Sequence, residues 1–106
     1  MSDAPFHTER TADRTVRLVG ELDLASFEIA LAELEPLLAE GGDLELDLQD
    51  LTFLDSSGIR VLIKCRTELG GRGRLRLRGA TPHVAKILEI AGLPDLGVRL
   101  EGRSDG

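Results

Sequence analysis

The segment 51–62, LTFLDSSGIRVL, holds the residues of this chain that are best placed to do chemistry. Two hydroxyls, those of Ser56 and Ser57, lie between Asp55 and Gly58 at the expected start of a helix. A hydroxyl there can accept a hydrogen bond from an unpaired amide of the first turn, so we expect Ser56 or Ser57 to be the N-cap. Gly58 leaves space for the backbone of another molecule, and a helix N-terminus favours an anion. The segment thus fits either a simple helix cap or a contact site.

Enzymatic chemistry is poorly supported by the same residues. A nucleophilic serine needs a histidine base and a third group that orients it, and the chain has only His7 and His83. Neither serine has the glycine two positions before it that a nucleophile elbow requires. The sequence has no glycine-rich phosphate loop followed by lysine, and no cluster of cysteine and histidine. We therefore expect no enzyme, no catalytic residue, no cofactor and no metal.

Composition narrows the classes of protein further. The chain has 106 residues with a formal net charge of -6, which suits one domain and disfavours direct binding to nucleic acid or an anionic membrane. The single cysteine, Cys65, excludes an internal disulfide and suits a reducing compartment. The first ten residues, MSDAPFHTER, lack the apolar run of a signal peptide. We expect a cytoplasmic protein.

Strands and helices alternate along the chain. Strands are expected at 15–20, 43–49, 74–78 and 97–101, with a shorter one at 6–10. Helical spacing of apolar residues covers 24–40 and 57–69, and a third helix should follow Thr81 as its cap and end at Gly92. Pro36 is expected to kink the first helix or end it early. The tail after the last strand is expected to be frayed.

This alternation predicts an α/β fold, with a mostly parallel sheet of four to five strands. Leucines alternate with charged residues in DLELDLQ and RLRLR, so we expect helices on one face and water on the other. If these strands are neighbours, their outward acids and arginines should pair. In the third helix we expect an apolar face of Val84, Ile87, Leu88 and Ala91, and we interpret Cys65 as a structural residue.

Several motifs together resemble one known family, the STAS domain of anti-sigma factor antagonists. Gly20–Asp23 (GELD) matches the family after its second strand, and Asp47–Leu51 followed by Phe53–Gly58 matches its strand and signature loop. Thr81–Val84 and Ile87–Leu93 resemble its third helix and the stop after it. The similarity runs from about residue 15 to 100, so we expect the whole chain, 1–106, to be a single STAS domain.

The resemblance implies a partner switch. Family members bind an anti-sigma factor that is also a serine kinase, and so release the sigma factor. The kinase phosphorylates the first serine of the loop, here Ser56, and a separate serine phosphatase removes the phosphate. Asp55 is assigned to loop geometry and kinase docking, and Asp23 to the contact surface. With Ser56, Ser57, Gly58 and Arg60, these residues form the expected partner-binding site.

Two departures from the family pattern leave alternatives open. Many members have glycine where this chain has Arg60, which follows Ser56 by four residues and either pairs with a phosphate there or reaches solvent. The family often adds a final helix, whereas this sequence stops at Gly106. A second hypothesis is a STAS subunit of a lipid-transport ATPase or a stress-signalling scaffold, where the loop often reads Asp-Thr-Ala-Gly. A third hypothesis is an isolated ligand-binding domain, but the sequence contains no pattern that indicates a ligand pocket.

Overall fold

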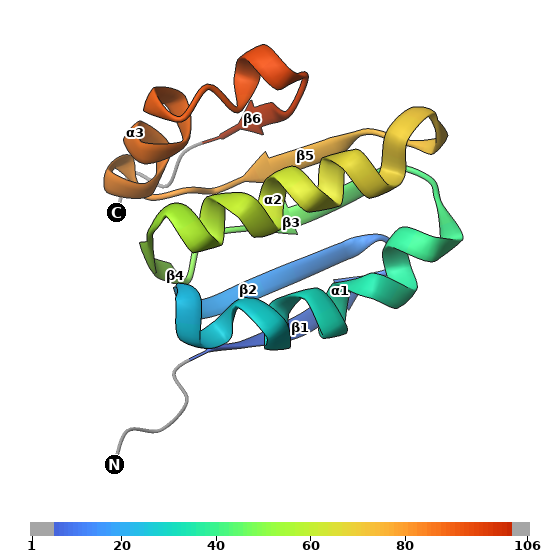
Figure 1. The fold of residues 1–106 in the computed structure, drawn as a ribbon, viewed down its shortest axis with the longest axis horizontal. Helices are drawn as coiled ribbons and strands as arrows, with labels where there is room; N and C mark the ends of the chain where they lie inside the picture. The colour runs from blue at the N-terminus through green and yellow to red at the C-terminus, as the bar shows by residue number, and fades with distance from the viewer. Residues whose placement is uncertain (1–5, 103–106) are drawn as a thin grey trace.

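A mixed β-sheet forms one layer of the protein in the computed structural model, which describes residues 6–102 (Figure 1). Its six strands are β1 (Phe6–Ala12), β2 (Thr15–Leu22), β3 (Leu44–Asp47), β4 (Leu51–Leu54), β5 (Leu75–Arg78) and β6 (Arg99–Glu101). The order across the sheet is β1-β2-β3-β5-β6, with β4 also paired to β2. Only the β1–β2 pair is antiparallel among these pairings, so the expected mostly parallel α/β fold is confirmed. Residues 103–106, in the expected frayed tail, lie outside the described residues.

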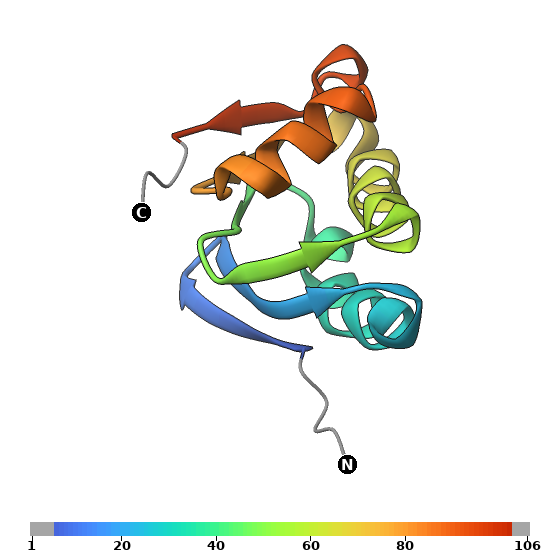
Figure 2. The ribbon, with the colours of Figure 1, turned by 90° about the vertical axis from the view of Figure 1, so that its left-hand side faces the viewer.

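The second layer is helical and covers one face of the sheet. It contains α1 (Phe27–Glu40), α2 (Ser56–Leu69) and α3 (Pro82–Ile90), with short 3-10 turns η1 (Leu24–Ser26), η2 (Gly70–Arg72) and η3 (Pro94–Leu96). Figure 2 shows α1 and α2 together on one side of the strands, with the other side of the sheet uncovered. The prediction of helices on one face is therefore confirmed. Within residues 6–102, no helix is both long enough and apolar enough to cross a bilayer.

The expected strand 43–49 is shorter in the structure, where it is β3, and the sheet has one strand more than predicted because β4 forms just after it. β3 pairs with the first half of β2, the chain then turns at Gln49 and Asp50, and β4 pairs with the second half of β2. The alternation of leucines ends at this turn, because Leu51 and Leu54 are buried while the two residues between them are exposed. The register shift between Gly20 and Glu21 accommodates this irregularity, which directs the end of β4 into α2.

Charged residues on the uncovered face pair across neighbouring strands, as the alternating pattern predicts. The register places Glu45 beside Arg76 and Asp47 beside Arg78. Arg78 Nε lies 2.8 Å from Glu45 Oε2, and Arg78 Nη2 lies 3.4 Å from Asp47 Oδ2. Arg17 Nε on β2 lies 3.5 Å from the same Asp47 oxygen. The Asp47 carboxylate is buried beneath these arginines, so the figure of about 0.2–1 kcal/mol for exposed pairs does not apply to it, and the pairs serve here as evidence for the register.

Pro36 does not end α1, so of the two effects expected of it, a kink or an early end, the early end is wrong. The helix continues through Pro36 to Glu40. Pro36 and Ala32, whose carbonyl would otherwise accept the missing amide hydrogen bond, are both exposed, so water can satisfy that carbonyl. The end of α1 is also held by two arginines: Arg14 Nη1 donates to the Leu37 carbonyl at 3.0 Å, and Arg72 Nη2 donates to the Leu38 carbonyl at 3.2 Å.

The apolar face of α3 differs from the expected one at its end. Val84 and Leu88 are fully buried and Ile87 is half-buried, but Ala91 lies just beyond the helix and is exposed. Ala85 is buried instead, and the chain returns to the core at buried Leu93 after the helix ends at Ile90. Thr81 caps the helix as predicted, with its hydroxyl accepting from the Val84 amide at 3.3 Å.

Truncation of Leu88 tests the placement of α3. Because Leu88 is fully buried in the common core, Leu88→Ala should lower the free energy of unfolding by about 2–5 kcal/mol. Chemical denaturation of the wild type and the variant measures this difference, with Lys86→Ala on the exposed side of the same helix as the control. A loss under about 0.5 kcal/mol for Leu88→Ala would show that the assigned face of α3 is wrong.

The thiol of Cys65 is buried on the inner side of α2, as expected for a structural residue. Burial, and to a smaller extent the nearby Glu68 carboxylate, raises the pKa of this thiol from 9.0 to about 12. The thiolate is the reactive form, so native labelling at about pH 8 should be far slower than labelling in denaturant.

The same raised pKa predicts a pH dependence of stability. The contribution of the neutral thiol is complete below the unfolded pKa of 9.0 and is lost as the pH rises toward about 12. Wild-type stability should therefore fall more steeply than that of Cys65→Ala across this range, as measured by denaturant melts. Parallel curves for the two proteins, or rapid native labelling, would contradict burial.

Candidate functional site

The Asp-Ser-Ser-Gly loop lies at the carboxyl edge of the sheet, where β4 passes into α2. Leu22 of β2 and Leu54 of β4 are partners in parallel register, so the two chains leave the sheet side by side. The Asp55 amide donates to the Leu22 carbonyl at 3.4 Å and ties the start of α2 to the end of β2. In the view of Figure 2, β2 and β4 both end against the helical layer at this edge. The fold therefore brings the segments after β2 and β4 together.

The N-cap of α2 is Asp55, and not Ser56 or Ser57 as the sequence led us to expect. Its Oδ1 accepts from the Ser57 amide at 2.9 Å and from the Gly58 amide at 3.1 Å. Asp55 has the extended backbone of a cap, and Ser56 is already the first helical residue. A carboxylate can satisfy both amides and also interacts favourably with the positive end of the helix, which explains why it takes this place.

Ser56 is left free for another role by this arrangement. It is exposed at the first position of α2, whereas Ser57 is half-buried. Of the two serines, Ser56 is thus the more accessible to a modifying enzyme. Its hydroxyl projects from the end of a helix whose nearest amides are already bound to Asp55.

Asp55→Ala and Ser56→Ala should separate the cap from the exposed hydroxyl. We expect Asp55→Ala to lower the free energy of unfolding by about 0.5–2 kcal/mol, because the Ser57 and Gly58 amides lose their acceptor. Ser56→Ala should stay within about 0.5 kcal/mol of the wild type. Urea melts of both variants measure the difference. A larger loss of unfolding free energy for Ser56→Ala than for Asp55→Ala would show that Ser56 is the N-cap.

Gly58 has an internal role that the sequence did not reveal. It is buried, and a Cβ built on it would collide with the Leu22 carbonyl oxygen and with the Leu54 side chain. The first turn of α2 packs directly on the ends of β2 and β4, and only glycine permits that approach. The close neighbour of Gly58 is therefore the protein's own backbone, which differs from the approach of another molecule that we expected.

Asp23 caps the turn that follows β2, in parallel with Asp55. Its Oδ1 accepts from the Ser26 amide at 3.1 Å, while its own amide donates to Ser26 Oγ at 2.9 Å. Ser26 Oγ also donates to the Glu21 carbonyl at 2.7 Å. Because Asp23 and Asp55 follow partnered residues of adjacent strands, the structure brings these two predicted site residues to the same edge.

Arg60 is exposed, which agrees with the solvent alternative considered for it, and it also makes a contact that neither alternative included. Its guanidinium lies over the ring of Phe27 on α1, with Cζ 5.2 Å from the ring centroid. This cation–π contact joins the first turns of α1 and α2 and contributes about 0.5–1 kcal/mol at an exposed site. The sequence signal for this contact is Phe27 near the start of the preceding helix. That signal is too weak to predict a cation–π contact.

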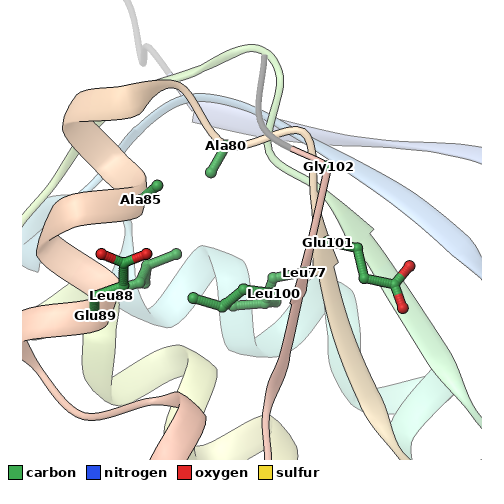
Figure 3. Close-up of a pocket in the computed structure, with 8 residues that line it drawn as sticks. All are labelled: Leu77, Ala80, Ala85, Leu88, Glu89, Leu100, Glu101 and Gly102. Carbon is green, nitrogen blue, oxygen red and sulfur yellow. The ribbon is translucent and has the colours of Figure 1, made fainter. Parts of the chain in front are cut away.

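A hollow lies elsewhere, between α3 and the β5–β6 edge (Figure 3). Its lining residues are Leu77, Ala80, Ala85, Leu88, Glu89, Leu100, Glu101 and Gly102. None of the expected site residues lines this hollow. In the close-up, the leucine side chains form its floor and the Glu101 carboxylate is directed away from it. It is therefore separate from the Ser56 edge.

Comparisons with known proteins place the chain in a family. A family model described as Mlab, STAS domain, matches residues 6–100. The anti-sigma-B factor antagonist of Bacillus subtilis (strain 168) is 30% identical over 97 residues, which span 89% of this chain and 86% of the relative. The chain therefore belongs to the STAS domain family.

Solved structures point to one branch of that family. The anti-sigma factor antagonist SpoIIAA in its unphosphorylated form is 26% identical, with a TM-score of 0.69, over 90% of this chain and 86% of SpoIIAA. The Bacillus SpoIIAA structure in the phosphorylated form is 25% identical, with a TM-score of 0.64, over 90% of this chain and 89% of its own. The particular relatives that this chain resembles in both sequence and structure are thus anti-sigma factor antagonists.

Proposed function

We propose that this protein is an anti-sigma factor antagonist that is switched off by phosphorylation of Ser56. In this proposal it acts in the cytoplasm, binds an anti-sigma factor with serine kinase activity, and thereby releases a sigma factor. A serine phosphatase restores the active form. The protein itself has no catalytic activity, and its contact residues are Asp23, Asp55, Ser56, Ser57 and Arg60, while buried Gly58 holds the loop against the sheet.

The observation that carries the proposal is the accessible Ser56 hydroxyl at the first position of α2. Asp55 takes over the capping of the helix, so the hydroxyl is not required to hold the fold. A regulatory phosphate needs such a position, because it must be added and removed without unfolding the domain. The similarity to SpoIIAA, which has been solved in unphosphorylated and phosphorylated forms, supports the same conclusion.

Phosphorylation by a purified kinase tests the proposal. Each serine kinase of the anti-sigma factor type from the source organism is incubated with the protein and ATP, and the product is mapped by mass spectrometry. We expect one kinase to bind the protein and to place a single phosphate on Ser56, with Ser56→Ala as the control that stays unmodified. Phosphate on Ser57, or no binding and no phosphate with any of these kinases, would contradict it.

Purification from native cytosol provides a second, independent test against the alternative function. A STAS subunit that braces a transport ATPase or a scaffold would have the same fold without the phosphate. In that case tagged protein should recover membrane transporter subunits, and the serine kinase would be absent. Recovery of the kinase that modifies Ser56 in the first experiment supports the switch.

A further inference from the structure

Leu24 is one of the most exposed large apolar side chains among residues 6–102. Its exposed fraction is 72%, and of the other large apolar residues only Ile90 on α3, at 76%, exceeds it. A single exposed leucine is common on protein surfaces and by itself indicates nothing. The position of Leu24 gives it significance, because it immediately follows Asp23 at the edge that carries Ser56.

The register of the sheet brings the segments that carry Leu24 and Ser56 to the same edge. Leu22 and Leu54 are partners on adjacent parallel strands, which lie about 4.8 Å apart. Leu24 and Ser56 are each two residues beyond these partners, on the segments that leave the same edge. An apolar side chain and an accessible hydroxyl are therefore both carried by segments that leave the same edge of the sheet.

The turn that carries Leu24 is held in a fixed conformation. Asp23 and Ser26 on either side of it form a reciprocal pair of hydrogen bonds, with 3.1 Å from the Ser26 amide to Asp23 Oδ1 and 2.9 Å from the Asp23 amide to Ser26 Oγ. Ser26 Oγ is further anchored on the Glu21 carbonyl at 2.7 Å. A partner that binds Leu24 would thus meet an ordered turn and lose little entropy in ordering it.

Exposed acidic residues flank Leu24 in the sequence. Glu21 and Glu28 are both exposed, three positions before and four positions after Leu24. The exposed guanidinium of Arg60 lies over the Phe27 ring and keeps its positive charge. It is outnumbered by the acidic residues at this edge, which are Glu21, Asp23, Glu28 and Asp55. The edge therefore offers an apolar centre with a negative rim, and its complement is an apolar pocket with a basic rim.

We propose that Leu24 is the apolar anchor by which this edge docks into a basic-rimmed pocket on the anti-sigma factor kinase. The proposal rests on the function proposed above, and it names the chemistry that the partner must present. It also explains how a phosphate on Ser56 would act. The phosphate would lie at the apolar centre, where it must lose its water, whereas Glu21 and Glu28 stay hydrated at the rim.

Truncation of the anchor tests this proposal with the kinase that modifies Ser56 in the preceding experiment. We expect Leu24→Ser to weaken binding to that kinase about thirtyfold, as for a central interface residue. Leu24→Met, which keeps an apolar side chain of similar volume, should bind within about threefold of the wild type. Affinity is measured by calorimetry, and thermal melts check that both variants are folded, which the exposure of Leu24 leads us to expect.

Ile90→Ser is the matched control, since Ile90 is equally exposed but lies at the end of α3. It should bind as the wild type does. The acidic rim is tested by Glu28→Gln, which should lower the association rate and its dependence on salt, with Glu89→Gln on α3 as its control.

The possible outcomes separate the two proposals. If the wild type binds and Leu24→Ser binds equally well, the anchor is wrong while the proposed function stands. Equal losses for Leu24→Ser and Ile90→Ser would also overturn the anchor, because the effect would not depend on position. If the wild type binds none of the kinases, the function itself fails and the docking surface fails with it.

Discussion

Ser56→Asp should fold as stably as the wild type and yet bind the anti-sigma factor more than about a hundredfold more weakly. A phosphate adds about -1.5 to -2 charges at neutral pH, and the substitution imitates part of that charge. On the free protein the charge remains hydrated because Ser56 is exposed, and the helix N-terminus partly compensates repulsion by Asp55. The fold therefore tolerates it.

In the complex the same charge must lose its water without gaining a partner. Desolvation of an unpaired charge costs several kcal/mol, and about 3 kcal/mol already corresponds to more than a hundredfold in affinity. The Ser57 and Gly58 amides cannot compensate it, because Asp55 already occupies them. The cost therefore appears in binding and not in folding.

Four forms of the protein test this prediction together. Calorimetry with the kinase should give strong binding for the wild type and Ser56→Ala, and weak binding for Ser56→Asp and for the phosphorylated wild type. Denaturant melts of the same samples should agree within about 1 kcal/mol. Equal affinities for all four would exclude a switch at Ser56. A marked loss of stability in the phosphorylated sample would show that phosphorylation prevents binding by unfolding the domain.

Most of the fold was predictable because the hydrophobic period is strong in this chain. Strict alternation in DLELDLQ and RLRLR gave adjacent strands, the face that is open to water, and the charge pairs across it. The predictions that failed concern features that depend on contacts between distant segments. The end of α1 is held by Arg14 and Arg72, which no local pattern connects to that helix. Strand β4 likewise depends on its pairing with the second half of β2, which is distant in the sequence.

The candidate site shows the same limit. The sequence located the loop and the accessible serine, but it assigned the cap to a hydroxyl when the neighbouring carboxylate holds it. Asp, Ser and Thr are all good N-caps, so three consecutive candidates cannot be ranked without the backbone. The contact between Arg60 and Phe27 depends on how α1 and α2 pack, which single-helix patterns do not contain.

Gly58→Ala should cost about 3 kcal/mol of stability, which makes it the most damaging single methyl addition that we expect in the loop. The new Cβ meets the Leu22 carbonyl oxygen and the Leu54 side chain at closer range than real Cβ atoms tolerate. A flexible side chain could turn away, but the carbonyl belongs to the end of β2 and can move only if the sheet edge moves. The better helix propensity of alanine, up to about 1 kcal/mol, offsets only part of this cost.

Gly71→Ala provides the control, because a Cβ on Gly71 meets nothing within 4 Å. Its stability should lie within about 0.5 kcal/mol of the wild type in the same denaturant melts. Binding to the kinase, measured where Gly58→Ala is still folded, then distinguishes the two roles of the glycine. An internal role predicts that stability falls first and that α2 shifts away from β2, so any loss of affinity follows from a displaced Ser56. A variant with wild-type stability and no affinity would instead show that Gly58 serves the approach of the partner.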